Sequence, residues 1–297
     1  MKGKIAMYPQ CNLGGNKPYS EVMGGFLPAL KDFYANPHKY RMEPFRIFGN
    51  LYYVGDQKVC MHLIDTGDGL ILFDSGYRHA THLLMDSILR LGYQPKDVKY
   101  LIHSHGHFDH FGGGNEFRSL YGTKIFMSRV DTELVRERPD RALTHLSSVP
   151  EEAMCWPDVE LEDGDVITLG NTSIKCVLAP GHTLGTMAFF FNVTDGEKTY
   201  RVGYMGGIGF LTVYKEFCRE YGLPEDKCER MEESIKKVWD EPVDIVIGNH
   251  PYHNCTLEKR QWMLDHPGTN PFIDPATWHI LLTSLEERRQ SFMALGY

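Results

Sequence analysis

Four histidines and one aspartate fall within eight residues, inside the stretch from Leu101 to Gly114. A short apolar run precedes them and a cluster of glycines follows them. Neither an ordinary protein core nor an ordinary surface needs that composition. Imidazole nitrogens and carboxylate oxygens are ligands that Zn²⁺ accepts in proteins. The stretch therefore predicts half of a metal site, and the rest of the chain should supply the other half.

The candidate ligands in this stretch are too close together in the chain to bind one ion. His105 and His107 follow the end of a predicted strand, where the backbone can curl and direct both imidazoles at one point. Asp109 and His110 lie about one turn further on. Because neighbouring side chains on a tight turn diverge, we expect two metals, with one pair of ligands for each. His103 is set aside, since its side chain should point to the other side of the strand.

Each metal then needs a further ligand from elsewhere in the chain. His182 stands at a tight turn after one predicted strand, and His250 stands in the same position after another. We expect His182 to complete the first site and His250 the second, with His253 as a rival for His250. The expected cofactor is two Zn²⁺ ions per chain. Two metals roughly 3.5–4 Å apart can hold a bridging hydroxide, lower the pKa of water toward about 7 and polarise a carbonyl.

Strands followed by helices occur twice, in two halves of similar make-up, and in each half a buried strand ends shortly before a candidate ligand. No linker with the composition of a domain boundary separates the halves, so the pattern favours one α/β domain with two sheets between helices. The strands are expected at residues 51–54, 59–65, 70–73, 98–102, 124–127, 166–169, 173–178, 186–192, 200–205 and 243–247, and the helices at 80–91, 115–121, 130–137, 212–221, 226–239 and 275–295.

The segments outside this pattern are assigned as extensions of the same domain. Residues 1–44 are rich in glycine and proline, so we expect an irregular arm whose aromatic residues pack on the core. Residues 45–260 form the main domain, and residues 261–297 a helical extension of it. Residues 138–160 form a long connection, and a loop of that length in a compact domain often borders a site.

Composition argues against several classes of protein. Of the 297 residues, 42% are hydrophobic and 24% charged, as in soluble globular proteins. The net charge is −8 and no long basic cluster occurs, so a nucleic-acid partner is not expected. No stretch approaches the roughly 20 apolar residues of a membrane helix, and no signal peptide precedes the domain, so we expect a cytoplasmic protein with no membrane partner. The seven scattered cysteines do not indicate a disulfide framework.

Three motifs in the chain resemble those of the metallo-β-lactamase superfamily. They are HGHFDHFGG at residues 105–113, ILFDSG at residues 71–76 and APGHT at residues 179–183. The resemblance covers roughly residues 45–259. It implies a single-domain αββα sandwich with zinc at one edge of the sheets. It also implies that Asp74 steadies a metal ligand by hydrogen bonds.

One departure from the family lies after the strand expected at 200–205. Glyoxalase-type, lactonase and nuclease members usually carry a bridging aspartate there, and other β-lactamase subclasses carry a cysteine. This chain has Gly206, Gly207 and Gly209 in that segment. Its all-histidine set and Asp-His set are therefore most similar to the third subclass of metallo-β-lactamases. The resemblance does not extend to the serines with which that subclass holds the β-lactam carboxylate, because glycines replace them.

These features predict a dinuclear zinc hydrolase that opens a cyclic amide, similar to a β-lactam, by attack of a metal-bridging hydroxide. The expected partner is a small-molecule substrate, and the sequence carries no signal for an oligomeric state. Asp109 is the expected catalytic residue, since it would orient the hydroxide and pass its proton to the leaving group. The candidates for the substrate pocket, with ordinary core packing as the alternative for its large side chains, are Phe108, Trp156, Gly207, Ile208 and Phe210.

Other interpretations of the same residues remain open. A lactonase or thioesterase of small metabolites would use the same fold and the same ligands. An iron-binding redox or sensor protein would use the cluster for another metal, although the missing bridging aspartate makes iron less favoured. A zinc scaffold without catalytic activity is the last alternative.

Overall fold

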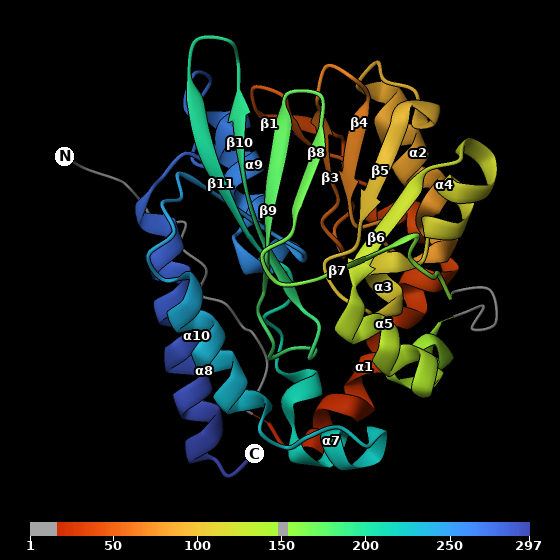
Figure 1. The fold of residues 1–297 in the computed structure, drawn as a ribbon, viewed down its shortest axis with the longest axis vertical. Helices are drawn as coiled ribbons and strands as arrows, with labels where there is room; N and C mark the ends of the chain where they lie inside the picture. The colour runs from red at the N-terminus through yellow and green to blue at the C-terminus, as the bar shows by residue number, and fades with distance from the viewer. Residues whose placement is uncertain (1–16, 148–153) are drawn as a thin grey trace.

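The computed structural model describes residues 17–147 and 154–297. Two β-sheets lie against each other, and helices cover their outer faces (Figure 1). One sheet has seven strands in the order β1-β2-β3-β4-β5-β6-β7, and the other has five in the order β12-β11-β10-β9-β8. The predicted αββα sandwich is therefore confirmed.

The seven-stranded sheet changes from antiparallel to parallel pairing at β4. The first four strands pair antiparallel, and β4 to β7 pair parallel. All four side chains of β4 are buried, which explains its uninterrupted apolar sequence. The strands are β1 (Phe45–Phe48), β2 (Leu51–Tyr53), β3 (His62–Asp65), β4 (Leu70–Phe73), β5 (Val98–Ile102), β6 (Lys124–Ser128) and β7 (Val159–Leu161).

The five-stranded sheet is antiparallel except for one pair, β11 and β12. Its strands are β8 (Val166–Leu169), β9 (Thr172–Leu178), β10 (Met187–Thr194), β11 (Thr199–Met205) and β12 (Ile245–Gly248). Between the sheets, the Phe73 ring packs 5.0 Å from that of Phe189 and 5.4 Å from that of Tyr204, measured between ring centroids. These rings belong to the core that holds the two sheets together.

Amphipathic helices bury one side on the sheets, as the spacing of their apolar residues predicts. Trp278 of α10, for example, is fully buried, and its ring lies 5.5 Å from that of Phe190. The helices after α1 are α2 (Thr81–Arg90), α3 (Phe108–Phe111), α4 (Gly114–Tyr121), α5 (Arg129–Glu137), α7 (Lys215–Tyr221), α8 (Lys227–Val238), α9 (Thr256–Asp265) and α10 (Ala276–Ala294).

The N-terminal segment is not irregular, and that prediction is wrong for the part that the structure describes. Helix α1 (Tyr19–Ala35) runs through Gly24, Gly25 and Pro28, residues that disfavour helix in isolation. Tertiary packing outweighs this preference, because the helix buries apolar side chains on the body, with Phe33 fully buried. Residues 1–16 of the expected arm lie outside the described residues.

A further expectation concerns the loop at residues 138–160. The loop contains short 3₁₀ turns at Pro139–Ala142 and Thr144–Leu146, and β7, which the sequence did not predict, occupies its end.

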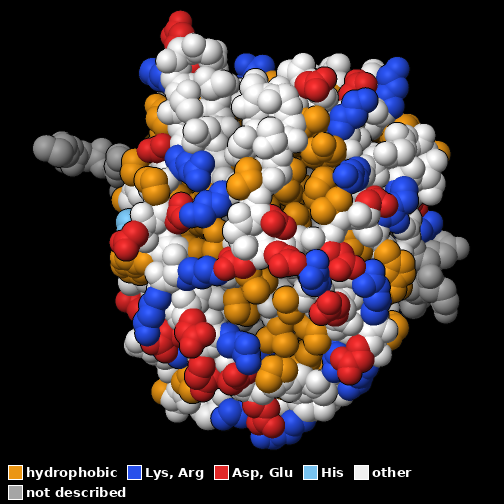
Figure 2. All heavy atoms as spheres, in the orientation of Figure 1, with side chains coloured by type: hydrophobic (Ala, Val, Ile, Leu, Met, Phe, Trp, Pro, Cys, Tyr) orange, Lys and Arg blue, Asp and Glu red, His pale blue; other side chains and the backbone are white. Residues whose placement is uncertain are grey.

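On the face in Figure 2, acidic and basic side chains are interspersed. The six cysteines in the described parts are free, whereas Cys11 lies outside them. None of the described helices is long and apolar enough to cross a membrane.

Candidate metal centre

The six candidate ligands lie where strands end, at one edge of the two sheets. β5 leads to His105 and His107, and the short helix α3 that follows carries Asp109 and His110. The turns after β9 and β12 carry the two remaining histidines, His182 and His250. A chain that leaves a strand is free to turn sharply, so each of these loops can direct its side chain toward a common point.

The structure brings these six residues together as two adjacent groups of three. We call His105, His107 and His182 the first trio, and Asp109, His110 and His250 the second trio. Within each trio, one potential ligand atom from each residue lies within 4.8 Å of the other two. The trios adjoin at His105 and His110, whose ring centroids are 4.3 Å apart. The grouping is the one that the sequence predicts.

In the first trio, backbone carbonyls orient two imidazoles. His105 Nδ1 donates to the Gly206 carbonyl and His182 Nδ1 to the Gly209 carbonyl, each at 2.8 Å. A carbonyl can only accept, so Nδ1 carries the proton and the Nε2 lone pair is left for the centre. His107 Nδ1 lies 3.1 Å from His182 Nε2. In metal-binding histidines, the ring nitrogen that does not bind the metal is commonly fixed by a hydrogen bond. The Nδ1 atoms of His105 and His182 are fixed in this way.

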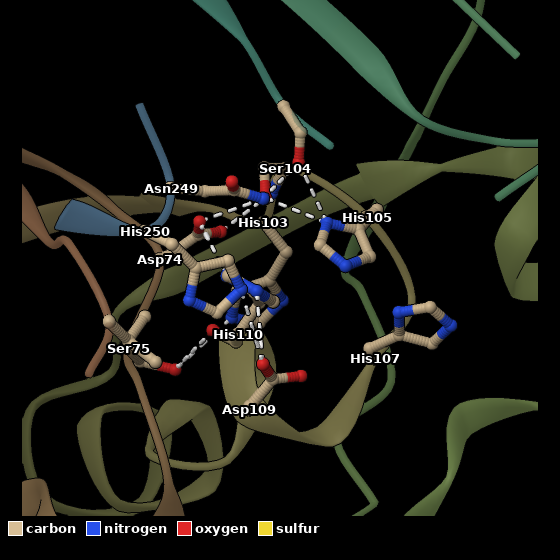
Figure 3. A network of polar contacts seen from close by, with 12 residues as sticks. Asp74, Ser75, His103, Ser104, His105, His107, Asp109, His110, Asn249 and His250 are labelled. Atoms are coloured by element: carbon tan, nitrogen blue, oxygen red, sulfur yellow. Dashed lines mark hydrogen bonds and ion pairs between the residues drawn. The ribbon is translucent and has the colours of Figure 1, made fainter. Parts of the chain in front are cut away.

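In the second trio, the buried Asp74 carboxylate and one backbone carbonyl orient two imidazoles. His110 Nδ1 donates to Asp74 at 3.0 Å, and His250 Nδ1 donates to the Lys58 carbonyl at 2.8 Å. Asp109 Oδ2 lies 3.3 Å from His110 Nε2 and 3.6 Å from His250 Nε2. Figure 3 shows Asp74 and Asp109 on opposite sides of the His110 ring.

The donor set fits a pair of metal ions. His105 Nε2 is buried and has no hydrogen-bond partner, and the buried His110 Nε2 faces the Asp109 carboxylate. A buried polar atom left unsatisfied costs about 1–3 kcal/mol, and a coordinated cation at the first trio would remove that cost. Five imidazoles and one carboxylate are ligands that suit Zn²⁺, and three protein ligands leave a position open for water or substrate.

The charges differ between the trios. Burial lowers the pKa of His105 and His107 well below the ordinary range, and lowers the pKa of His182 to about 3, so these rings are neutral, as ligands must be. Burial would also lower the pKa of His110, but Asp109 and Asp74 outweigh it and raise the pKa to about 10. The two carboxylates that favour a proton on His110 would equally favour a metal cation beside it.

Asp74 is the centre of a hydrogen-bond network behind the second trio. It is fully buried and has a positive φ of 56°, which is uncommon for a residue other than glycine. Besides His110, its carboxylate accepts from Tyr204 Oη at 2.7 Å and from the Ser104 backbone N at 2.7 Å. Ser104 Oγ also donates to it, at 2.8 Å. The motif that carries Asp74 indicates its role, whereas no sequence signal indicates Tyr204.

Asp131 on α5 joins the two loops that carry the first trio. Its Oδ2 accepts from the Gly106 backbone N and from Thr183 Oγ1, both at 2.7 Å, and its Oδ1 accepts from the Gly185 backbone N at 2.8 Å. Lys227 supports the same region, since its Nζ donates to the His182 carbonyl at 2.7 Å. Neither Asp131 nor Lys227 is predicted from the sequence, because a single charged residue on a helix gives no signal of a buried partner.

His103, which is not expected to be a ligand, and His253, the alternative to His250, belong to neither trio. His103 is buried, and its Nε2 lies 3.4 Å from Ser75 Oγ. Its ring packs against Gly114, where a Cβ atom would lie 3.1 Å from His103 Cε1. The His253 ring lies beside that of His250, with centroids 5.2 Å apart. In the described residues the metal-ligand geometry therefore includes His250 and not His253.

A cavity of about 260 Å³ opens onto both trios, with His107, His182, Asp109 and His250 in its lining. Four of the five predicted pocket residues line it, namely Phe108, Gly207, Ile208 and Phe210. Trp156 does not, since its ring lies beside the Arg136 guanidinium instead. The prediction missed other apolar lining residues, which are Val22, Phe26, Tyr77, Leu143, Leu211 and Tyr252. Leu143 belongs to the long loop that was expected to border the site.

Close neighbours explain two of the glycines after β11, Gly206 and Gly207. A Cβ atom at Gly207 would lie 2.8 Å from His182 Cδ2, and one at Gly206 would lie 2.3 Å from the Met187 carbonyl oxygen. Real side chains essentially never make contacts that short. Residue 207 therefore cannot carry a serine here without moving the His182 ring, so the glycine follows from the geometry of the first trio.

Comparison with known proteins agrees with this geometry. Residues 55–195 match the model of the metallo-beta-lactamase superfamily. An uncharacterized protein of Aquifex aeolicus is 28% identical over 167 residues, which are 54% of this chain and 72% of that protein. The probable polyketide biosynthesis zinc-dependent hydrolase PksB of Bacillus subtilis is 25% identical over 53% of this chain and 57% of its own length. A hydroxyacylglutathione hydrolase of Maricaulis maris is 36% identical over 31% of this chain and 28% of its own length.

Solved structures match over more of the chain than these relatives do. The FEZ-1 metallo-beta-lactamase from Legionella gormanii is 28% identical, with a TM-score of 0.74 over 86% of this chain and 96% of its own. BJP-1, a subclass B3 metallo-beta-lactamase of Bradyrhizobium japonicum, is 26% identical, with a TM-score of 0.72 over 86% of this chain and 95% of its own. The solved structures that this chain resembles thus include a member of the third subclass, to which the sequence motifs are also most similar.

Proposed function

The chain belongs to the metallo-β-lactamase superfamily and is a metallo-hydrolase, and we propose that it uses two zinc ions to open a cyclic amide or cyclic ester. The observation that carries this proposal is the pair of adjacent trios that face one cavity. Two ions held side by side can act together on one carbonyl. The relative named as a zinc-dependent hydrolase supports the choice of metal.

The bound zinc pair would supply a Lewis acid and a water of lowered pKa. The first and second trios would hold that pair, and the hydrogen bonds at their Nδ1 atoms keep the rings in place. Burial alone would raise the pKa of Asp109, but His110 and His250 outweigh it and hold this carboxyl well below its usual range. Asp109 is therefore an acceptor that lines the cavity. Its carboxylate can orient the attacking water and pass a proton to the leaving nitrogen or oxygen.

The test combines metal content with turnover of three carbonyl substrates. We expect the purified protein to hold two zinc ions and to hydrolyse an unsubstituted γ-lactone faster than nitrocefin, whose β-lactam nucleus carries a carboxylate. His105→Ala and Asp109→Ala should each abolish turnover without changing the circular dichroism spectrum. His266→Ala removes an exposed histidine at the end of α9 and is the matched control. Unchanged turnover in either of the first two variants would overturn the proposed mechanism.

A thioesterase is the second candidate, because the hydroxyacylglutathione hydrolase relative shares 36% identity over 92 residues. A glutathione thioester carries carboxylates, whereas the described lining of the cavity contains neither Lys nor Arg. The cavity therefore favours an uncharged substrate over that thioester. An acyl-glutathione thioester is accordingly the third substrate of the panel, and faster turnover of it than of the other two would favour the second candidate.

A further inference from the structure

The cavity above the trios is mostly apolar and nearly without charge. Among the described residues that line it, none is Lys or Arg, and Asp109 is the sole carboxylate. A carboxylate on a substituent that lies away from the trios would find no cationic side chain there, and burial of a charge without a partner is costly. An apolar group would gain free energy by leaving water. The lining therefore favours a substrate with an uncharged substituent.

Helix α1 contributes part of this lining. Val22 and Phe26 are four residues apart, so they share one face of the helix, and both line the cavity. They precede residue 55, where the match to the superfamily model begins. This wall of the cavity thus comes from a segment outside the part of the chain that the family model covers.

Contacts at both ends fix α1 across the cavity. Near its start, Tyr214 Oη donates to the Lys17 carbonyl at 2.6 Å, and the Tyr19 ring lies 6.4 Å from that of Phe217 in α7. At its end, Tyr34 Oη donates to the Leu146 carbonyl at 2.7 Å. Figure 1 shows α1 and α7 side by side at one end of the molecule. Because both ends are held, the side chains between them keep a defined position at the cavity.

We propose that Val22 and Phe26 form a specificity wall that receives an uncharged, apolar substituent of the substrate. The preferred substrate is then a neutral cyclic ester or amide with an alkyl or aryl group, not one with a carboxylate beside the reacting ring. This inference rests on the proposed hydrolase function and names its substrate class. It assigns a binding role to α1, whose residues do not contribute to either trio.

The first test is a series of γ-lactones with the zinc-loaded enzyme. The series contains unsubstituted γ-butyrolactone, its γ-ethyl, γ-butyl and γ-hexyl derivatives, and the γ-carboxylate. Each methylene that becomes fully buried should raise kcat/KM by about fourfold until the wall is covered, and the carboxylate should be the poorest substrate. Phe26→Ala and Val22→Ala should reduce the dependence of kcat/KM on chain length. Ser20→Ala, at an exposed position of the same helix, should behave as the wild type.

One further variant and one binding measurement test this inference separately from the proposed function. Phe26→Leu should restore most of the chain-length dependence, which a general loss of folding in Phe26→Ala would not explain. Binding of the corresponding alkyl- and carboxyl-substituted cyclopentanones, which have no ester or amide bond to hydrolyse, can be measured by calorimetry without any turnover. Affinity that rises with chain length in the wild type and not in Phe26→Ala supports the wall, even if no lactone is hydrolysed. Equal affinities along the series, or a preference for the carboxylate, overturn it.

Discussion

The two trios lie side by side, yet the chain holds them by different means. The first consists of three neutral imidazoles, and backbone carbonyls and Asp131 fix its loops. The second contains a carboxylate, and its His110 depends on one buried side chain, Asp74. Backbone carbonyls remain after any side-chain substitution, whereas a carboxylate can be removed by one. The second trio should therefore be the more sensitive of the two to single substitutions.

The largest expected effect comes from Asp109→Asn. The amide keeps the shape but removes the negative charge of the second trio and the group that would move a proton. We expect kcat to fall roughly 10²–10⁴-fold, the range for loss of a positioned acid or base. Zinc content should fall from two ions to one, because the first trio keeps its three imidazoles. Measurement of kcat, and of zinc content by inductively coupled plasma mass spectrometry, checks both statements. Full turnover by a variant that holds a single zinc ion would contradict the role of the second trio.

The next effect in size is that of Asp74→Asn. This change removes the charge that stabilises His110 while leaving every ligand in place. Loss of such an outer partner typically costs 10–100-fold in metal affinity or activity, and we expect the loss at the second trio. Competition with a zinc chelator measures the two affinities separately. Tyr204→Phe, which removes one of the donors to Asp74, should have a smaller effect in the same direction. An equal weakening of both zinc sites would contradict the comparison.

A smaller effect, on the other trio, is expected for Asp131→Asn. Asparagine offers one acceptor oxygen, so it cannot accept all three hydrogen bonds that Asp131 accepts. The loops that carry His105, His107 and His182 should loosen, and zinc affinity at the first trio should fall by roughly tenfold. The same chelator competition measures it. Glu133→Gln changes an exposed carboxylate of the same helix and should have no effect. A loss confined to the second trio would show that Asp131 does not act as inferred.

The sequence is sufficient to predict which six residues the structure brings together, because four of them form one local motif and all of them follow strand ends. His105 to His110 form one dense motif, and His182 and His250 each stand just after a strand, so the topology brings them together. The supports could not be predicted in the same way. Asp131 is one acidic residue on an amphipathic helix, and its role depends on loops about 25 and 52 residues away in the chain.

The N-terminal helix could not be predicted for a related reason. Gly24, Gly25 and Pro28 all disfavour helix in isolation, and local preference is what a sequence pattern reports. In the folded protein, burial of Phe33 and the contacts at both ends outweigh it. Trp156 was assigned to the pocket because it is aromatic and lies in the long loop. Its ring instead lies beside Arg136 of α5, and no local pattern indicates that these two residues meet.

The smallest expected effect on activity is that of Asp56→Asn, which tests the turn behind His250. The carboxylate of Asp56 accepts from the backbone N atoms of Lys58 at 2.6 Å and Val59 at 2.8 Å, and the Lys58 carbonyl in turn holds His250. Asparagine keeps one oxygen to accept these bonds, so turnover and zinc content should stay near the wild-type values. Retained activity would place the role of Asp56 in stability and not in the trio itself.

The stability effect of this substitution depends on pH in a defined direction. Burial raises the pKa of Asp56 to about 6, from 3.8 in the unfolded chain. The folded state thus binds more protons between these values, and the free energy of unfolding should fall as pH rises from about 4 to 6, by on the order of 3 kcal/mol. Asp56→Asn removes the titrating group, so its unfolding free energy should decline less over that window. Urea unfolding of both zinc-free proteins between pH 4 and 7 gives the difference, and parallel curves would contradict a buried, titrating Asp56.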